Sequence, residues 1–318
     1  MTMERMTTRF APLNLLSLRD LEFRLGENRI TLRRLAEHPH LYYSPFGQEK
    51  KVKPFQRVVS DKKRPIDNPC AELKVIQKKI ATILLGGPGT PDFLHGSVKG
   101  RTIKTNMAAH QAAEVMVKMD IKSYFVNVTE DLVFRVWHRE LKCSRAVAEL
   151  LTQLTTFNGH LPQGAPTSSA LANIYLSSAF GSLLGQSREL GVTPGAYVDD
   201  IQFSGPNARL MMEPTRKRLA RDGFSFPNKK REVMGRYKSK IVAGIRAGKD
   251  GPRAPKNKLS DLRAGFHKLK LGLVPEHERP AYIQRLAARI SHINQICPKD
   301  AAKYQALLQV VRMTPWQL

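Results

Sequence analysis

The stretch GAYVDDIQFSG, residues 195–205, places two adjacent carboxylates, Asp199 and Asp200, between two β-rich apolar runs. The runs and their bounding glycines predict a β-hairpin with the acidic pair at its tip. Neighbouring like charges repel each other and are costly near the interior of a fold unless a positive group lies between them. Asp is also common at solvated turns, where it favours the backbone conformation. The rest of the chain decides whether this hairpin is a surface turn or a functional site.

The composition predicts a partner that carries many negative charges. The 318 residues include 52 Lys and Arg against 27 Asp and Glu, which gives a formal net charge of +25. Such an excess makes a folded chain repel itself, and it favours nucleic acid as the partner over an anionic membrane surface. With 42% hydrophobic residues, the chain can bury a full core and divide into two or three subdomains.

Cysteine usage and hydropathy indicate the compartment. Cys70, Cys143 and Cys297 are too few and too scattered to predict a disulfide framework or a zinc site, and they favour inert thiols in a reducing environment. The N-terminal residues have no apolar run long enough for a signal peptide, and no later stretch is long enough to span a bilayer. The sequence therefore predicts a cytoplasmic protein without a membrane partner.

The order of expected elements is typical of an α+β fold, with a sheet that has helices on one face. In the strand expected over 114–121, Asp120 lies opposite the most apolar face, because residues alternate between the two sides of a strand. Asn28 is a possible cap of the first helix, and Thr167 or Ser168 of a later one. Helices are expected over 28–38, 71–85, 130–157, 167–184, 207–222 and from 252 onward, hairpins over 48–69 and 195–205, and short strands around 225–230 and 239–247.

Three carboxylates have a shared chemical logic. Asp120 and the pair Asp199 and Asp200 would meet if their strands were neighbours in one sheet. Clustered carboxylates are stable in a basic protein if they hold a divalent metal, and hard oxygen ligands suit Mg²⁺. Two such ions about 4 Å apart stabilise the attacking and leaving oxygens of an in-line phosphoryl transfer. This chemistry would explain why the acids lie at the tip of a hairpin.

Three motifs, in this order and spacing, resemble the palm of a reverse transcriptase, and the chain is most similar to the compact bacterial retron type. They are KMDIKSYF (118–125), LPQGAPTSSALANIYL (161–176) and YVDD (197–200). The resemblance runs from about residue 50 to the C-terminus. It implies a right-hand polymerase architecture with fingers, a palm made of an antiparallel sheet backed by helices, and a small helical thumb. The expected divisions are an N-terminal helical extension (1–47), fingers (48–113), palm (114–250, with a fingers insertion at about 130–160) and an RNA-binding thumb (251–318).

The resemblance implies a set of catalytic residues. Asp120, Asp199 and Asp200 match the carboxylates that hold two Mg²⁺ ions, with Mn²⁺ as a substitute, and the backbone carbonyl of Ile121 would add a ligand. One ion would lower the pKa of the attacking hydroxyl, and the other would neutralise charge on the triphosphate. The lysine pair in PNKKRE, Lys229 and Lys230, matches the motif after the catalytic hairpin, and Lys230 is the favoured proton donor to the pyrophosphate leaving group.

The resemblance also implies a dNTP-binding set. Phe125 matches the aromatic steric gate, since a ring beneath the incoming sugar leaves no room for a 2′-hydroxyl. By itself, an aromatic residue at this position is more often part of the core. The remaining members line the nascent base pair or grip the triphosphate, although any basic residue in such a run is more often a solvated charge. They are Gln163 and Gly164 for the base pair, Arg64 with Lys63 and Lys74 for the triphosphate, and Lys229 as a further dNTP-binding residue.

Two short elements bear on the retron subtype. NMAAH places Asn106 and His110 where retron enzymes have N-A-x-x-H, and VAG places Val242 and Gly244 where they have V-T-G. Both are near matches, with Met107 and Ala243 as departures, and the resemblance implies an RNA-related role for Asn106, His110, Val242 and Gly244. In addition, Ser169 replaces the proline that usually follows QGxPTS, a position where serine can cap a helix.

The basic charge is concentrated after the catalytic hairpin. Residues 216–270 contain 18 Lys and Arg against 4 Asp and Glu, with sparse aromatic residues, which favours a grip on the backbone of an RNA–DNA duplex over base stacking.

A true retron enzyme would reverse transcribe its own structured noncoding RNA, which serves as both template and primer, into branched RNA-linked DNA (msDNA). Its role would be anti-phage defence in the bacterial cytoplasm, beside an effector protein encoded nearby, with a host ribonuclease H removing template RNA. Two alternatives stay open: another bacterial reverse transcriptase, group II intron-like or defence-associated, and a non-catalytic RNA-binding protein on a polymerase fold. The chain length leaves no room for a maturase or endonuclease domain, which counts against the intron type.

Overall fold

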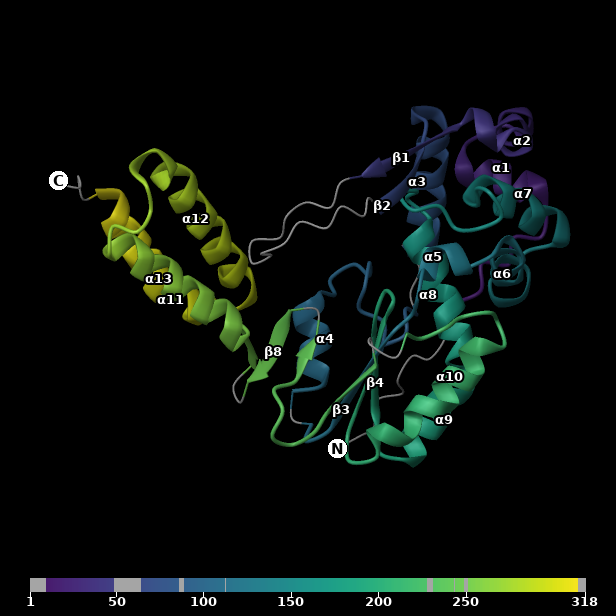
Figure 1. Ribbon diagram of the computed structural model, residues 1–318. Helices are drawn as coiled ribbons and strands as arrows, with labels where there is room; N and C mark the ends of the chain where they lie inside the picture. Colours follow the sequence, from purple (N-terminus) through teal and green to yellow (C-terminus); the bar gives the residue numbers. More distant parts are fainter. Residues whose placement is uncertain are drawn as a thin grey trace. The chain divides into compact units, whose positions relative to one another are not determined.

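The computed structural model describes residues 10–48, 64–85, 89–111, 113–227, 231–242, 244–248 and 251–313. These residues form two compact units, one from the described parts of 1–48 and 64–237 and the other from those of 238–318. Both contain helices and antiparallel strands, so the expected α+β class is confirmed (Figure 1). None of the described helices is long and apolar enough to cross a lipid bilayer.

The first unit is built on a four-stranded antiparallel sheet of order β4-β5-β3-β6. Its strands are β3 (Met116–Asp120), β4 (Thr193–Tyr197), β5 (Asp200–Ser204) and β6 (Arg231–Met234). A second, two-stranded sheet pairs β1 (Tyr43–Gln48) with β2 (Arg64–Pro69). The hairpin expected over 48–69 lies mostly outside the described residues, but its C-terminal strand and the helix that follows are in place.

Several helices of the first unit begin directly after the residue whose side chain caps them. Asn28 accepts a hydrogen bond from the Thr31 N–H at 2.8 Å, as the sequence predicts. The helices are α1 (Leu18–Leu25), α2 (Arg29–Glu37), η1 (Pro39–Leu41), α3 (Ala71–Leu85), α4 (Ile103–Ala109), α5 (Tyr124–Asn127), α6 (Glu130–Arg135), η2 (Val136–Glu140), α7 (Arg145–Thr155), α8 (Ser168–Ala179), α9 (Gly181–Glu189), η3 (Ala208–Met211) and α10 (Met212–Ala220).

Two expected helices are interrupted. The segment 130–157 divides into α6, the π-helical turn η2 and α7, because Lys142 has a left-handed backbone (φ +57°) and Ser144 caps a new helix. The segment 167–184 divides into α8 and α9 at Phe180. Thr167 precedes α8 but makes no side-chain cap, and Ser168 instead donates to the carbonyl of Pro162 at 2.6 Å. Ser169 lies inside α8, so the expected caps at this helix are wrong.

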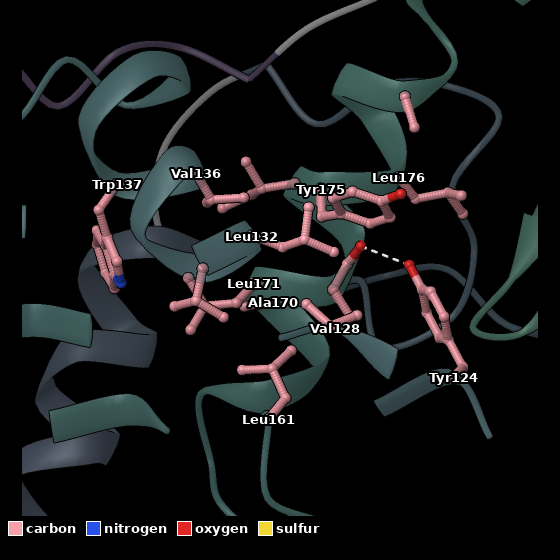
Figure 2. Packing of buried hydrophobic residues seen from close by; sticks show 14 of the residues in the cluster. Tyr124, Val128, Leu132, Val136, Trp137, Leu161, Ala170, Leu171, Tyr175 and Leu176 are labelled. Carbon is pink, nitrogen blue, oxygen red and sulfur yellow. Dashed lines mark hydrogen bonds between the residues drawn. The ribbon is translucent and has the colours of Figure 1, made fainter. Parts of the chain in front are cut away.

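The main core lies between one face of the sheet and the helices α6, α7 and α8. Figure 2 shows Ala170 and Leu171 of α8 packed among Leu132, Val136 and Leu161. On β5, Ile201 and Phe203 point into this core and are completely buried. Because residues alternate along a strand, the other side of β5 carries Asp200, Gln202 and Ser204.

Helix α4 packs against this second side of the sheet, so helices cover parts of both faces rather than one. Figure 1 draws α4 on one side of β3 and β4, and α9 and α10 on the other. The carboxylates therefore lie on the face of the sheet that carries α4, away from the main core.

The second unit contains a three-stranded sheet and a helical bundle with its own apolar cluster. Its boundary falls at Tyr237, so the strands expected in the palm before residue 250 group with the C-terminal helices. The elements are β7 (Ile241–Val242), β8 (Ile245–Gly248), β9 (Gly251–Arg253), α11 (Lys256–Lys270), η5 (Glu276–Glu278), α12 (Arg279–Ile296) and α13 (Pro298–Met313).

Candidate active site

The backbone of the sheet brings the three predicted carboxylates to one end of it. Asp120, the last residue of β3, is directly opposite Asp200, the first residue of β5. The Ile121 N–H donates to the carbonyl of Asp199 at 3.0 Å, which extends the pairing past the strand end. Side chains directly opposite each other on an antiparallel pair have Cβ atoms about 5 Å apart. Register, rather than a flexible loop, therefore determines the spacing of Asp120 and Asp200.

A lysine that the sequence did not single out offsets part of this negative charge. Lys118 lies two residues before Asp120 on the same face, and its Nζ is 3.1 Å from Oδ1 of Asp200. The two side chains keep only 23% and 15% of their surface exposed. The alternation of β3 could have identified Lys118, because Lys118 and Asp120 share the side opposite the apolar residues.

The donor set fits Mg²⁺ by its chemistry. Asp120, Asp199 and Asp200 are half-buried and supply hard oxygen atoms, and the carbonyl of Ile121 follows directly on the strand end. Among the described residues, no three acidic, His or Cys side chains are already gathered as a metal-binding cluster. Mg²⁺ retains several waters and usually takes one or two carboxylates plus substrate phosphates, so a closed cage is not required.

The turn between β4 and β5 has an unusual conformation. Tyr197 pairs with Asp200, which leaves only Val198 and Asp199 as a two-residue loop. Val198 has a φ of +59°. A positive φ at the first loop position normally requires glycine, and for a β-branched residue it is strained. The surrounding contacts must therefore hold the acidic turn in place.

The expected steric gate, Phe125, lies on α5 five residues after Asp120 and is half-buried. Its neighbour Tyr124 is buried and donates a hydrogen bond to the carbonyl of Ala172 in α8 at 2.7 Å, drawn as the dashed line in Figure 2. Burial raises the pKa of the Tyr124 phenol far above its ordinary value, and the charge of Asp199 adds to the shift. Tyr124 thus fixes α5 to the core and leaves the next side chain, Phe125, at the surface of that core.

The loop with Gln163 and Gly164 lies against strand β2. The Asp67 N–H donates to the Gln163 carbonyl at 2.8 Å, and the Gln163 N–H donates to the Asp67 carboxylate at 3.2 Å. Gly164 has a φ of +126°, and a Cβ there would lie 3.0 Å from Cγ2 of Ile66. The positive φ therefore favours glycine, and a Cβ at this position would also be tightly packed against β2. Asp67, which lies outside the motifs visible in the sequence, fixes this loop to β2.

The basic residues expected around the triphosphate are only partly described. Lys74 lies on α3 and donates to Oδ1 of Asn68 at 2.9 Å, so its ammonium is held at the end of β2. Arg64 begins β2, but its side chain lies outside the described part of the structure, as do Lys63, Lys229 and Lys230. Their roles stay predictions.

Asn106 of α4 and His110, which directly follows that helix, belong to the interior next to the acid-bearing face of the sheet. Both are at most 1% exposed. Asn106 donates to the Gln202 side chain at 3.1 Å, and Nδ1 of His110 is 2.7 Å from Oγ of Ser204. Gln202 in turn donates to the backbone carbonyl of Asp200 at 2.9 Å. The structure thus links these two residues to the strand that carries Asp200, and their expected RNA-related role stays a prediction.

This packing predicts a loss of stability in acid. Burial, and to a smaller extent the neighbouring His95, lower the pKa of His110 to about 4. Because this pKa is below the ordinary value near 6.5, the unfolded chain binds the proton more readily. The stabilisation is present above pH 6.5 and is lost as the pH falls toward 4, by up to roughly 3 kcal/mol. We expect urea unfolding at pH 5 and pH 7 to show this direction.

A His110→Gln variant has no ring to protonate and is the control for this prediction. It should lose less stability than the wild type over the same pH interval. Some dependence should remain, because burial and then Arg101 also lower the pKa of His95 to about 4. Equal losses in the variant and the wild type would contradict the assignment to His110.

Val242 and Gly244 lie in the second unit. Val242 is completely buried in β7, and Gly244 has a φ of +80°. The carbonyl of Gly244 accepts a hydrogen bond from Nζ of Lys258 in α11 at 3.1 Å. Within this unit, the glycine connects the small sheet to the helical bundle.

An antiparallel sheet that presents acids from a strand end and an adjacent hairpin is the arrangement expected of a nucleotidyl-transferring palm, and comparison with known proteins gives the family. Residues 49–247, more than half of the chain, match the family described as reverse transcriptase (RNA-dependent DNA polymerase). The chain belongs to this family.

The chain is also similar to curated bacterial retron proteins. It is 30% identical over 294 residues to the retron Mx162 reverse transcriptase of Myxococcus xanthus, covering 79% of this chain and 59% of the relative. It is 27% identical over 254 residues to the retron Ec86 reverse transcriptase of Escherichia coli, covering 78% and 76%. A third match, 26% identical over 245 residues to the retron Ec48 reverse transcriptase of Escherichia coli, covers 71% and 60%. The predicted resemblance to retron-type enzymes is confirmed at the level of sequence.

Proposed function

We propose that this chain is an RNA-directed DNA polymerase of right-hand architecture whose palm contains the sheet β4-β5-β3-β6. The observation that carries the proposal is the placement of Asp120 opposite Asp200, with Asp199 in the connecting turn, in a member of the reverse transcriptase family. The proposed divisions are the extension 1–47, fingers 48–113, palm 114–250 with its fingers insertion, and thumb 251–318. The grouping of residues 238–250 with the C-terminal helices favours a palm that ends earlier.

The proposed roles follow the chemistry of the side chains. Asp120, Asp199, Asp200 and the Ile121 carbonyl would hold two Mg²⁺ ions, which activate the attacking hydroxyl and neutralise triphosphate charge when bound. Lys118 keeps Asp200 within the site by its ion pair. Gln163 and Gly164 line the nascent base pair, while Arg64, Lys63, Lys74 and Lys229 bind the triphosphate. Lys230 protonates the leaving group.

We further propose a retron function. The chain would reverse transcribe its cognate structured noncoding RNA, starting from a 2′-hydroxyl of that RNA, into branched RNA-linked single-stranded DNA. The names of its relatives and the elements NMAAH and VAG support this subtype. The partners would be the RNA, its DNA product, dNTPs, an effector protein in phage defence and a host ribonuclease H, in the bacterial cytoplasm.

Sequencing of DNA that co-purifies with the protein tests the retron function. We expect short single-stranded DNA joined to RNA through a 2′–5′ bond that a debranching enzyme removes. An Asp199→Asn variant expressed beside the same RNA should carry the RNA without the DNA. Linear cDNA without a branch would leave the polymerase in place and reject the retron function.

Replacement of the gate residue should change sugar selectivity. In Phe125→Ala, the space beneath the sugar is no longer filled, so a 2′-hydroxyl is accommodated. We expect incorporation of ribonucleotides to rise by about 10²-fold relative to dNTPs, as for other steric exclusions worth a few kcal/mol. Competition between dNTPs and rNTPs in primer extension measures the ratio.

The matched control for this change is Phe134→Ala, which removes a partly buried aromatic ring packed on the same core but on α6. This variant should keep the wild-type selectivity. Unchanged sugar selectivity in Phe125→Ala would reject the role of Phe125 as a steric gate and favour that of an ordinary core residue.

A further inference from the structure

A short segment pairs with the outer edge of the sheet next to the acidic turn. Strand β4 is at the edge, with β5 on its inner side. On its outer side, the Ala196 N–H donates to the Phe93 carbonyl at 2.7 Å, and the His95 N–H donates to the Ala196 carbonyl at 2.8 Å. These bonds make a parallel bridge between Leu94 and Ala196. The segment 93–96 thus continues the sheet by one partial strand, two residues before the turn.

The last residue of this segment contacts the strained residue of the turn. A Cβ on Gly96 would lie 2.5 Å from the backbone nitrogen of Val198 and 2.6 Å from its Cγ2. Real Cβ atoms do not approach this closely, so only glycine fits without movement of the turn. Gly96 has no unusual φ, so its requirement comes from the contact alone. The backbone of Gly96 is therefore packed closely against Val198, whose φ is +59°.

Two side chains, Asn173 and Arg101, hold the segment that contains Gly96 by hydrogen bonds to its backbone carbonyls or to those just before it. Asn173 on α8 is 3% exposed and donates from Nδ2 to the Gly96 carbonyl at 2.8 Å. Arg101 donates to the Leu94 carbonyl at 2.7 Å and also to the carbonyls of Pro91 and Thr90. The buried amide of Asn173 and the guanidinium of Arg101, which donates to three carbonyls, together restrict the backbone conformation of this segment. Asn173 belongs to α8 and Arg101 to the segment before α4, so neither residue is part of the turn.

We propose that Gly96 and Asn173 are positioning residues of the polymerase site, which hold Val198 in its left-handed conformation and thereby orient Asp199 and Asp200. The inference rests on the proposed polymerase function. A two-residue turn with a β-branched residue at positive φ relaxes unless its surroundings resist, and relaxation rotates the peptide that leads into Asp199. Asn173 acts through Gly96, and Gly96 acts through Val198.

The decisive variant is Gly96→Ala, which adds one methyl group against Val198. We expect kcat in primer extension to fall by about 10²-fold, as for a displacement of reacting groups by about 1 Å, without a rise in KM for template–primer. Binding of Mn²⁺ to the protein, measured by electron paramagnetic resonance without substrate, should weaken several-fold. Template–primer affinity and the thermal midpoint report that the variant is folded.

Gly185→Ala is the matched control, because a Cβ at Gly185 of α9 meets no atom within 4 Å. It should behave like the wild type in every measurement. If Gly96→Ala does not fold, Asn173→Leu answers the same question, since it removes the bond to Gly96 and adds nothing to the contact with Val198. It should also weaken Mn²⁺ binding.

Folded variants with wild-type Mn²⁺ binding and wild-type kcat would overturn the positioning role. Weakened Mn²⁺ binding with an unchanged thermal midpoint would support it, because a merely structural contribution lowers the folded fraction and leaves the affinity of the folded molecules unchanged. Failure of the wild type to extend a primer would reject the polymerase function instead, and the Mn²⁺ measurement would still decide whether Gly96 orients the turn.

Discussion

An Asp199→Asn variant is expected to lose DNA synthesis by roughly 10³-fold or more. The change keeps the shape of the side chain and removes its charge, so it eliminates a carboxylate ligand from a site where metal contributes several kcal/mol to transition-state stabilisation. The backbone carbonyl of Asp199 accepts a hydrogen bond from the Ile121 N–H, and the substitution leaves this bond intact, so the backbone of the turn should not move. Primer extension with an RNA template measures the loss.

Binding of the template–primer separates this result from unfolding. It should be retained in Asp199→Asn, because phosphate contacts depend on the positive charge of the protein and the variant has one negative charge fewer. Asp131→Asn, at an exposed acid in the first turn of α6, is the matched control and should synthesise DNA normally. Equal synthesis by Asp199→Asn and the wild type would reject the proposed site, and a wild type that binds RNA but never extends a primer would favour the non-catalytic alternative.

A Gly195→Ala variant is expected to be destabilised by about 3 kcal/mol. The added Cβ would lie 2.3 Å from Nε2 of His110 and 2.9 Å from Oδ1 of Asn106. Both neighbours are buried and hydrogen-bonded to β5, so relief of the clash breaks a bond or moves a strand, at the upper end of the usual cost of overpacking. Chemical unfolding followed by circular dichroism measures the difference.

A double-mutant cycle assigns this cost to the contact. His110→Ala alone should destabilise the protein, because it removes the bond to Ser204 and leaves a cavity. In the Gly195→Ala, His110→Ala double variant, the new methyl group occupies part of that space, so the combined loss should be smaller than the sum of the two. Additive losses would show that Gly195 is required for another reason, and Gly185→Ala should be neutral or slightly stabilising.

Local chemistry made part of the molecule predictable. Hydrophobic periodicity and helix capping depend on residues that are neighbours in the chain, so they can be recognised in the sequence. They predicted helix α2 with its Asn28 cap, helix α3 over residues 71–85, strand β3 and the hairpin around Asp199. The break in the helix after η2 could not be predicted from the sequence. Lys142 adopts its left-handed backbone next to Leu141, whose carbonyl accepts hydrogen bonds from the N–H groups of Leu13 and Asn14. Contacts between distant segments decided that break.

The candidate site divides in the same way. Residue type, order and spacing determined which acids to select, and the family match over residues 49–247 includes the same motifs. Only the register of β3 against β5 decided that Asp120 is opposite Asp200 and that Lys118 can reach the latter. Likewise, NMAAH was visible as a motif, but only tertiary packing placed Asn106 and His110 against Gln202 and Ser204.

The sequence by itself determined the class of chemistry, since carboxylates, a YVDD hairpin and a large positive charge are properties of residues and their order. The tertiary structure decided which other residues serve that chemistry. Gly96 and Asp67 lie outside the three palm motifs, and Asn173 lies inside the second motif without a role that the sequence assigns to it. Their importance arises from close approach and from hydrogen bonds across the fold, which exist only once strands and helices have packed.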